Sequence, residues 1–170
     1  MIRRKPFNVT LIQPPGYIHS LALREAAEYV HFMLTACGFP SRLSPNQLAL
    51  DAHNIIFCAH LLRERDLARI PADSIVFNSE QLDDANGWHF ASGVYGRILE
   101  SFHVWDYSLR NLAGIRHERK SFIPFLYCRA LARPGMRRAP GRTLLFYGAL
   151  TERRKRILEA IENAGVPVDV

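Results

Sequence analysis

Polar side chains stand where several apolar stretches of this sequence end. His60 closes the stretch "HNIIFCAH", Glu80 closes "DSIVFNSE", and Asp106 lies in "HVWDYS". An imidazole or a carboxylate can accept a proton from a substrate hydroxyl that lies within hydrogen-bond reach. These three residues are therefore our candidate catalytic residues, with His60 or Glu80 as the preferred base.

Other polar and aromatic residues near the same stretch ends could hold a substrate. Amide and imidazole groups can form hydrogen bonds with sugar hydroxyls, and a tyrosine ring can stack on a sugar or a base. The candidate substrate-binding residues are Tyr17, His19, Asn78, Gln81, Tyr107 and Asn111.

Each candidate catalytic residue also has a purely structural explanation. His60 could lie near a helix start and have its hydrogen bonds satisfied there. Glu80 could lie in the first turn of a helix, where its negative charge interacts favourably with the helix dipole. Asp106 or Ser108 could cap the short segment that ends at Gly114. The sequence leaves both explanations open.

We expect no metal site in this chain. His53, Cys58 and His60 would have to supply three ligands from one strand, whose successive side chains point to opposite faces. The three cysteines are far apart and lack C-x-x-C spacing, so neither a disulfide framework nor a zinc site is indicated. This cysteine usage fits a reducing, cytoplasmic compartment.

The elements that position the candidate residues are indicated by the hydrophobic pattern. Continuous apolar stretches predict strands that are buried on both faces, as in a mainly parallel sheet covered by helices. Pro124 interrupts the apolar stretch "SFIPFLY" of residues 121–127 and predicts an edge or bent strand there. The expected strands are residues 7–16, 41–44, 53–60, 73–80, 103–108 and 121–127, and the expected helices are residues 20–37 and 88–102.

The predicted fold is α/β and Rossmann-like, with a mainly parallel sheet flanked by helices. In an open sheet of this kind, the carboxyl ends of the strands share one edge, and ligands bind in the crevice outside that edge. We therefore expect the polar stretch ends to meet in one crevice.

The end of the chain contains a second candidate site. Residues 143–150 predict a strand, Thr151 is a suitable N-cap, and the following helix should turn Ile157, Leu158, Ile161 and Ala164 inward before Gly165 ends it. A glycine and a helix N-terminus next to arginines could bind a diphosphate group. A surface helix with a solvated basic face would show the same sequence pattern. The candidate diphosphate-binding residues are Gly148, Thr151, Arg153 and Arg154.

Composition limits the class of protein. The 170 residues are 48% hydrophobic and 22% charged, which is typical of a globular chain, and no apolar stretch is long enough to span a bilayer. The formal net charge of +6 favours anionic partners such as nucleotides, nucleic acid or an acidic membrane surface that the protein contacts peripherally.

Five blocks of the sequence resemble, in order, bacterial glycosyltransferase-like proteins of the GT-B fold: "IIFCAHLL", "SIVFNSEQL", "VWDYSLRN", "FIPFLYCRAL" and "LLFYGALTERRKRIL". This resemblance implies two Rossmann-like lobes, sugar transfer from a nucleotide-sugar to a glycan-type acceptor, and catalysis without a bound metal or other cofactor. It places His60, Glu80 and Asp106 on the acceptor side, and Gly148 with Arg153 or Arg154 at the donor diphosphate.

The resemblance also implies a division of the chain. Residues 1–133 would form the amino lobe, residues 134–142 a linker rich in proline, glycine and arginine, and residues 143–170 the opening of a truncated second lobe. Alternatively, residues 143–170 could dock on the first sheet.

Two other classes of function stay open. A non-catalytic binding or scaffold protein could keep the fold and form homo-oligomers through unpaired strand edges. A nucleic-acid binder, which is the least favoured class, would use the arginines between Arg129 and Arg156, but these are not interleaved with aromatic residues.

Overall fold

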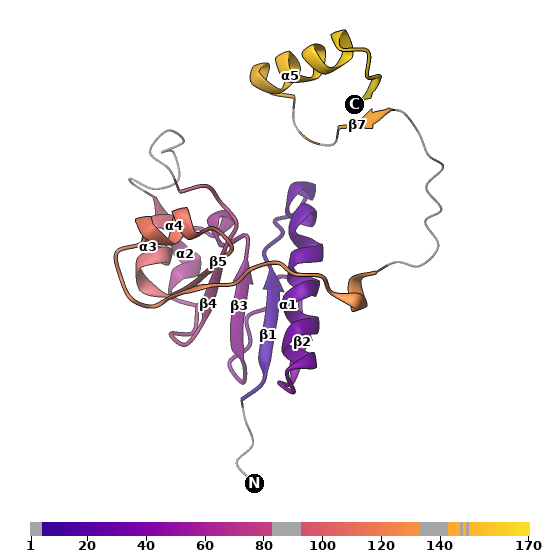
Figure 1. Cartoon of the computed structure of the whole chain (residues 1–170). Coiled ribbons are helices and arrows are strands. Elements are labelled where there is room, and N and C mark those ends of the chain that lie inside the picture. The colour runs from indigo at the N-terminus through magenta and orange to yellow at the C-terminus, as the bar shows by residue number, and fades with distance from the viewer. Residues whose placement is uncertain (1–4, 83–92, 133–142, 147, 149) are drawn as a thin grey trace. The chain divides into compact units, whose positions relative to one another are not determined.

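A computed structural model of the chain describes residues 5–82, 93–132, 143–146, 148 and 150–170 (Figure 1). Its internal contacts divide the chain into two compact units, Met1–Ala132 and Arg133–Val170. We describe each unit by itself.

The first unit contains a six-stranded sheet in the order β2-β1-β3-β4-β5-β6, and every neighbouring pair of strands is parallel. The predicted α/β, Rossmann-like fold with a mainly parallel sheet is thereby confirmed. The strands are β1 (Phe7–Leu11), β2 (Ser41–Leu43), β3 (His53–Phe57), β4 (Ile75–Asn78), β5 (His103–Asp106) and β6 (Lys120–Phe122).

Helices and short helical turns lie in most connections between these strands, whereas a loop joins β2 to β3. The α-helices of the first unit are α1 (Arg24–Ala36), α2 (Glu64–Leu67), α3 (Val94–Ser101) and α4 (Leu109–Gly114). The 3-10 turns are η1 (Ile18–Leu23), η2 (Ala59–Leu61) and η4 (Arg129–Leu131).

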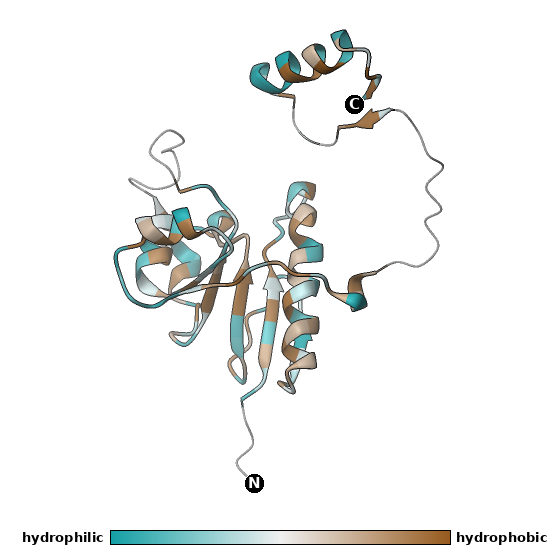
Figure 2. Ribbon diagram, viewed as in Figure 1, coloured by the Kyte–Doolittle hydropathy of each residue, from teal (hydrophilic) through white to brown (hydrophobic). Residues whose placement is uncertain are grey.

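The core lies on both faces of the sheet. Ile55, Ile56 and Phe57 are successive residues of β3 and are all fully buried, which explains why this strand is a continuous apolar run. Phe57 belongs to the cluster that packs against α1, whereas Ile56 belongs to the cluster that packs against Ile98 of α3. In Figure 2 the strands between these helices carry brown, apolar segments next to teal, hydrophilic ones.

Several element boundaries differ from the predicted ones. Predicted helix 20–37 begins as η1 and becomes α-helical only at Arg24. Predicted strand 53–60 ends at Phe57, because Cys58 adopts a left-handed conformation with φ 56° and the chain turns into η2. The strand predicted over residues 121–127 is β6, which ends before Pro124 and lies at the sheet edge as expected.

The predicted helix of residues 88–102 is α3, and the part of the prediction before residue 93 lies outside the described residues. The predicted linker, residues 134–142, lies outside them as well. Among the helices of the described residues, none combines the length and the apolar character that crossing a membrane requires.

The second unit contains two short parallel strands, β7 (Leu144–Leu145) and β8 (Val168–Asp169), and the helix α5 (Glu152–Asn163). The Thr151 hydroxyl accepts a hydrogen bond from the Arg154 backbone N–H at 3.3 Å, so the predicted N-cap is confirmed. Gly165, with φ 86°, follows the helix end as predicted. The expected inward face is smaller than predicted, because Leu158 is buried whereas Ile157 and Ala164 are exposed.

Candidate functional site

The strand order reverses direction between β1 and β3, and this is where ligands bind in open α/β sheets. A pocket of about 210 Å³ lies at the carboxyl ends of β1, β3 and β4. It is lined chiefly by Tyr17, His19, Ser20, Cys58, His60, Ser79 and Glu80. The structure therefore brings together four of the candidate residues from three separate loops.

His60 and Glu80 form a pair within this pocket. The Nδ1 atom of His60 lies 3.2 Å from Oε1 of Glu80, and the two side chains are 14% and 26% exposed. The distance suits an ion pair with a protonated imidazole, but the contact does not have hydrogen-bond geometry and so does not fix the tautomer of the ring. The pair thus places a carboxylate beside the imidazole of a candidate general base.

The turn after β3 positions the histidine. Cys58 is a non-glycine residue in the left-handed region, and it reverses the chain so that Ala59 becomes buried and His60 reaches the pocket. Burial, together with the nearby charge of Glu80, raises the pKa of the Cys58 thiol to about 12. The thiol is thus kept protonated beside the pair.

A buried hydrogen-bond network holds the backbone of Glu80. Asn78, which ends β4, donates from Nδ2 to the Glu80 carbonyl at 3.0 Å and accepts the Glu80 backbone N–H at Oδ1, at 3.1 Å. Asn111 also donates to the Glu80 carbonyl, at 2.9 Å, and its Oδ1 accepts the Leu82 N–H. The loop that carries Glu80 is therefore fixed from both sides.

Asp106 lies in this network and is fully buried. Its Oδ2 accepts hydrogen bonds from Asn78 at 2.5 Å and from Asn111 at 3.0 Å, and its Oδ1 accepts the Ser108 N–H at 2.7 Å. Burial raises the pKa of the Asp106 carboxyl, and these hydrogen bonds act in the opposite direction. This placement gives Asp106 a positioning role beneath Glu80.

Tyr95 completes the network and was not among the residues singled out from the sequence. Its hydroxyl donates to Asn78 Oδ1 at 2.5 Å, and its ring meets His60 edge to face at 5.9 Å between centroids. Burial raises the Tyr95 pKa well above the usual value, and the charges of Glu80 and Asp106 act in the same direction. The phenol thus remains a donor that links the network to the His60 ring.

The remaining substrate-binding candidates of the first unit divide into two that line the pocket and two that do not. Tyr17 and His19 line the pocket and contact each other, with 5.1 Å between their ring centroids. Tyr107 is partly exposed and packs on Phe125 at 5.6 Å, and Gln81 is exposed. Neither Tyr107 nor Gln81 lines the pocket.

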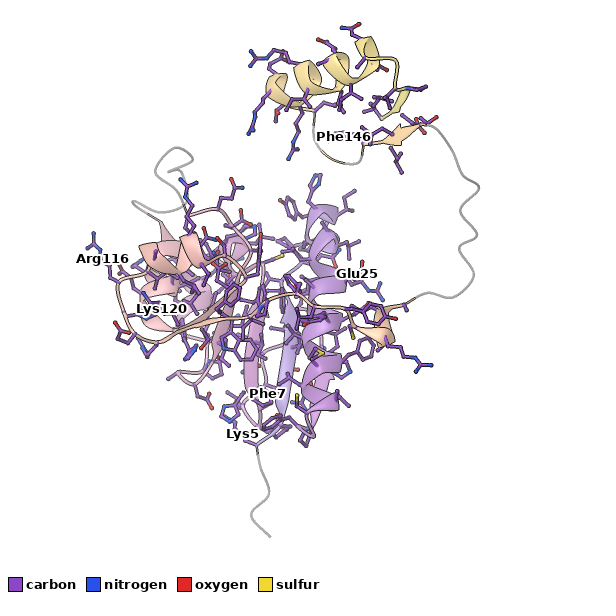
Figure 3. The ribbon with its side chains drawn as sticks, in the orientation of Figure 1. Lys5, Phe7, Glu25, Arg116, Lys120 and Phe146 are labelled. Carbon is purple, nitrogen blue, oxygen red and sulfur yellow. The ribbon has the colours of Figure 1, made fainter. Side chains whose placement is uncertain are left out.

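The candidates of the second unit lie around the start of α5. Gly148 has φ 146°, a conformation that favours glycine. The Arg154 guanidinium lies 5.9 Å from the ring centroid of Phe146, which Figure 3 labels. Arg153 is exposed in the first turn of α5, next to the Thr151 cap.

Within the described ranges, no three histidine, cysteine, aspartate or glutamate side chains gather in a way that could hold a metal ion. No family model, no curated protein and no solved structure matches the chain. The functional argument therefore depends on the geometry of the pocket.

Proposed function

We propose that the first unit is the acceptor-binding part of a glycosyltransferase-like enzyme in which His60 is the general base. The observation that carries this proposal is the His60–Glu80 pair, with 3.2 Å between Nδ1 and Oε1, in a pocket at the point where the strand order reverses. A histidine beside a carboxylate can accept the proton of a hydroxyl, and the carboxylate then stabilises the imidazolium.

The reaction would proceed by direct transfer. The acceptor hydroxyl oxygen forms a bond to the anomeric carbon of a nucleotide-sugar, while the bond from that carbon to the diphosphate oxygen breaks. The hydroxyl proton moves to Nε2 of His60, and the nucleoside diphosphate leaves with the electron pair of the broken bond. Glu80 stabilises the imidazolium that forms.

The pocket volume supports a small acceptor group. Sites for drug-sized ligands measure roughly 300–1,000 Å³, whereas this pocket measures about 210 Å³. One sugar ring or a group of similar size therefore suits it better than an oligosaccharide. The tyrosine ring of Tyr17 and the polar groups of His19 and Ser79 would contact that ring.

The second unit, taken by itself, would bind the diphosphate of a nucleotide-sugar. The N-terminus of α5, the exposed Arg153 and the neighbouring Arg154 supply positive charge of the kind that binds a diphosphate. In this proposal, Gly148 permits a close approach to the backbone and Thr151 caps the helix.

The test measures release of nucleoside diphosphate by the full chain, with a panel of uridine and guanosine diphosphate sugars and of monosaccharide and glycan acceptors. The His60→Gln variant should lower the rate roughly 10²–10⁴-fold, because general-base catalysis contributes that much. Release at the wild-type rate by His60→Gln, or no transfer by the wild type with any pair, would contradict the proposal.

A matched control exists at the opposite edge of the sheet. His53, the first residue of β3, has Nδ1 at 3.1 Å from Oδ2 of Asp73, which also binds Lys5. Figure 3 labels Lys5 and Phe7 at this amino-terminal edge. His53→Gln removes a pair of the same kind at the other end of β3 and should leave the rate unchanged.

A second candidate function, a non-catalytic binding protein, is supported by a different observation. Four large apolar residues after or within β6 are exposed: Phe122, Phe125, Leu126 and Tyr127. Contiguous exposed apolar residues often mark protein interfaces. In this case light scattering would detect a stable oligomer or complex, and His60→Gln would leave it intact.

A further inference from the structure

A second pocket opens at the same edge of the sheet and is not used by the proposed transfer. It measures about 540 Å³ and lies at the carboxyl ends of β1, β2 and β3. We propose that this pocket binds a small organic anion whose phosphate or carboxylate group contacts Arg63 and Arg65.

The charge of the lining favours an anion. Arg63 and Arg65 are exposed, and within the part of the chain that the structure describes neither guanidinium has an ion-pair or hydrogen-bond partner. Asp66 is the carboxylate of the lining, and its Oδ2 accepts a hydrogen bond from the Arg63 backbone N–H at 3.0 Å. Two guanidinium groups are thus available to an oxyanion, which they can bind through paired N–H donors.

The polar side of the pocket is fixed before any ligand binds. Asn46 donates from Nδ2 to the Gln13 carbonyl at 2.9 Å, and its Oδ1 accepts the Gln13 N–H at 2.7 Å. The Asn46 backbone N–H donates to the Leu11 carbonyl at 3.1 Å, and the φ of Asn46, 57°, is one that asparagine adopts more readily than most residues. A fixed loop lowers the entropic cost of binding.

The remaining wall indicates the rest of the ligand. Ile12, Pro14 and Pro15 follow β1, and Leu61 and Leu62, which follow β3, belong to the same lining. Apolar walls with a few polar groups are typical of sites that enclose the body of a small molecule. The expected ligand therefore has a ring or another apolar body and one anionic group, rather than being a free inorganic ion.

The two pockets share their boundary in the sequence. Pro14, Pro15 and Gly16 line the second pocket directly before Tyr17 of the first, and Leu61 directly follows His60. The anion site does not depend on the transfer reaction, because it is tested by binding alone.

The experiment is calorimetric titration of the full chain with phenyl phosphate, benzoate and uncharged benzyl alcohol. At least one of the two anions should bind saturably in the millimolar range, which is ordinary for ligands of this size, and benzyl alcohol should bind more weakly. Tighter binding of phenyl phosphate assigns a phosphate ligand, and tighter binding of benzoate assigns a carboxylate.

Variants locate the anion. The double variant Arg63→Gln, Arg65→Gln should lose at least about tenfold in affinity, because each charge-assisted hydrogen bond lost weakens binding to that degree. Arg69→Gln removes an exposed arginine of the same segment that does not line the pocket, and it should bind as the wild type does. His60→Gln should also bind normally.

Three results would overturn the proposal. They are the absence of saturable binding by either anion, unchanged affinity in the double variant, and loss of anion binding in His60→Gln, which would move the anion to the other pocket. Failure of sugar transfer leaves these results unaffected, so the two proposals fail independently.

Discussion

The two units of this chain contain the same local pattern, an apolar stretch that ends in polar residues before a helix, but they use it differently. In the first unit, β4 ends in Asn78 and β5 ends in Asp106, and both side chains are fully buried and hydrogen-bonded to each other. In the second unit, β7 has two residues, and Thr151 and Arg153 after it are exposed.

The difference lies in what surrounds each strand. The strands of the first unit are covered by helices on both faces, so their polar ends lie where water is excluded and must bond to one another. In α5, Leu158 is the buried residue, and the polar groups of the helix are solvated. The same sequence pattern thus produces a fixed network in one unit and an open helix start in the other.

The largest effect is expected for Asn78→Ala. This change leaves the Asp106 carboxylate and the Tyr95 hydroxyl each short of a partner in a buried place, and the Glu80 N–H short of one in a partly buried place. The free energy of unfolding should fall by about 3 kcal/mol or more, since each such group costs roughly 1–3 kcal/mol. Urea unfolding followed by circular dichroism measures the change.

The control is Asn163→Ala in α5, where the asparagine is exposed at the helix end. It should change the free energy of unfolding by less than about 0.5 kcal/mol. Equal changes in the free energy of unfolding for the two substitutions would contradict the claim that the buried network stabilises the first unit.

A smaller loss is expected for Tyr95→Phe. The ring stays in place, but Asn78 Oδ1 loses the hydroxyl donor while keeping the Glu80 N–H. We expect a loss of about 1.5 kcal/mol in the same unfolding measurement. Tyr127→Phe, at a tyrosine that is 83% exposed, should have no measurable effect. An unchanged free energy of unfolding for Tyr95→Phe would mean that the Tyr95 hydroxyl does not stabilise the network.

The smallest effect is expected in the second unit. Thr151→Ala removes the hydroxyl that accepts the Arg154 N–H, and loss of such a cap costs about 1 kcal/mol. Hydrogen exchange of the α5 amides should become faster, whereas exchange in β3 should not change. Thr143→Ala is the control, because Thr143 is exposed before β7. Faster exchange in β3 would show that the two units are stabilised together.

Much of the fold could be predicted because its signals are local. The continuous apolar run predicts strand β3, Thr151 predicts the start of α5, and Gly165 predicts its end. Each of these signals depends only on residues of that segment. The meeting of His60 with Glu80 also follows from sequence, since the carboxyl ends of parallel strands share an edge.

What sequence could not provide depends on packing between distant elements. Tyr95 reaches Asn78 only because α3 packs on the sheet, and no spacing rule connects the two residues. The left-handed turn at Cys58 has no sequence signal, because glycine or asparagine is the usual residue for such a turn. The sequence could not show whether Asp106 lines the pocket or lies beneath it, because this depends on the side chains that cover Asp106 in the folded chain.

The most direct test of the central claim, that the ends of β1, β3 and β4 form one binding site, is a nuclear magnetic resonance titration of the labelled full chain with monosaccharides. We predict saturable shifts of the Tyr17, His60 and Glu80 amides with a single affinity for at least one sugar. The claim is contradicted if these three amides do not move with any sugar, or if they respond with different affinities.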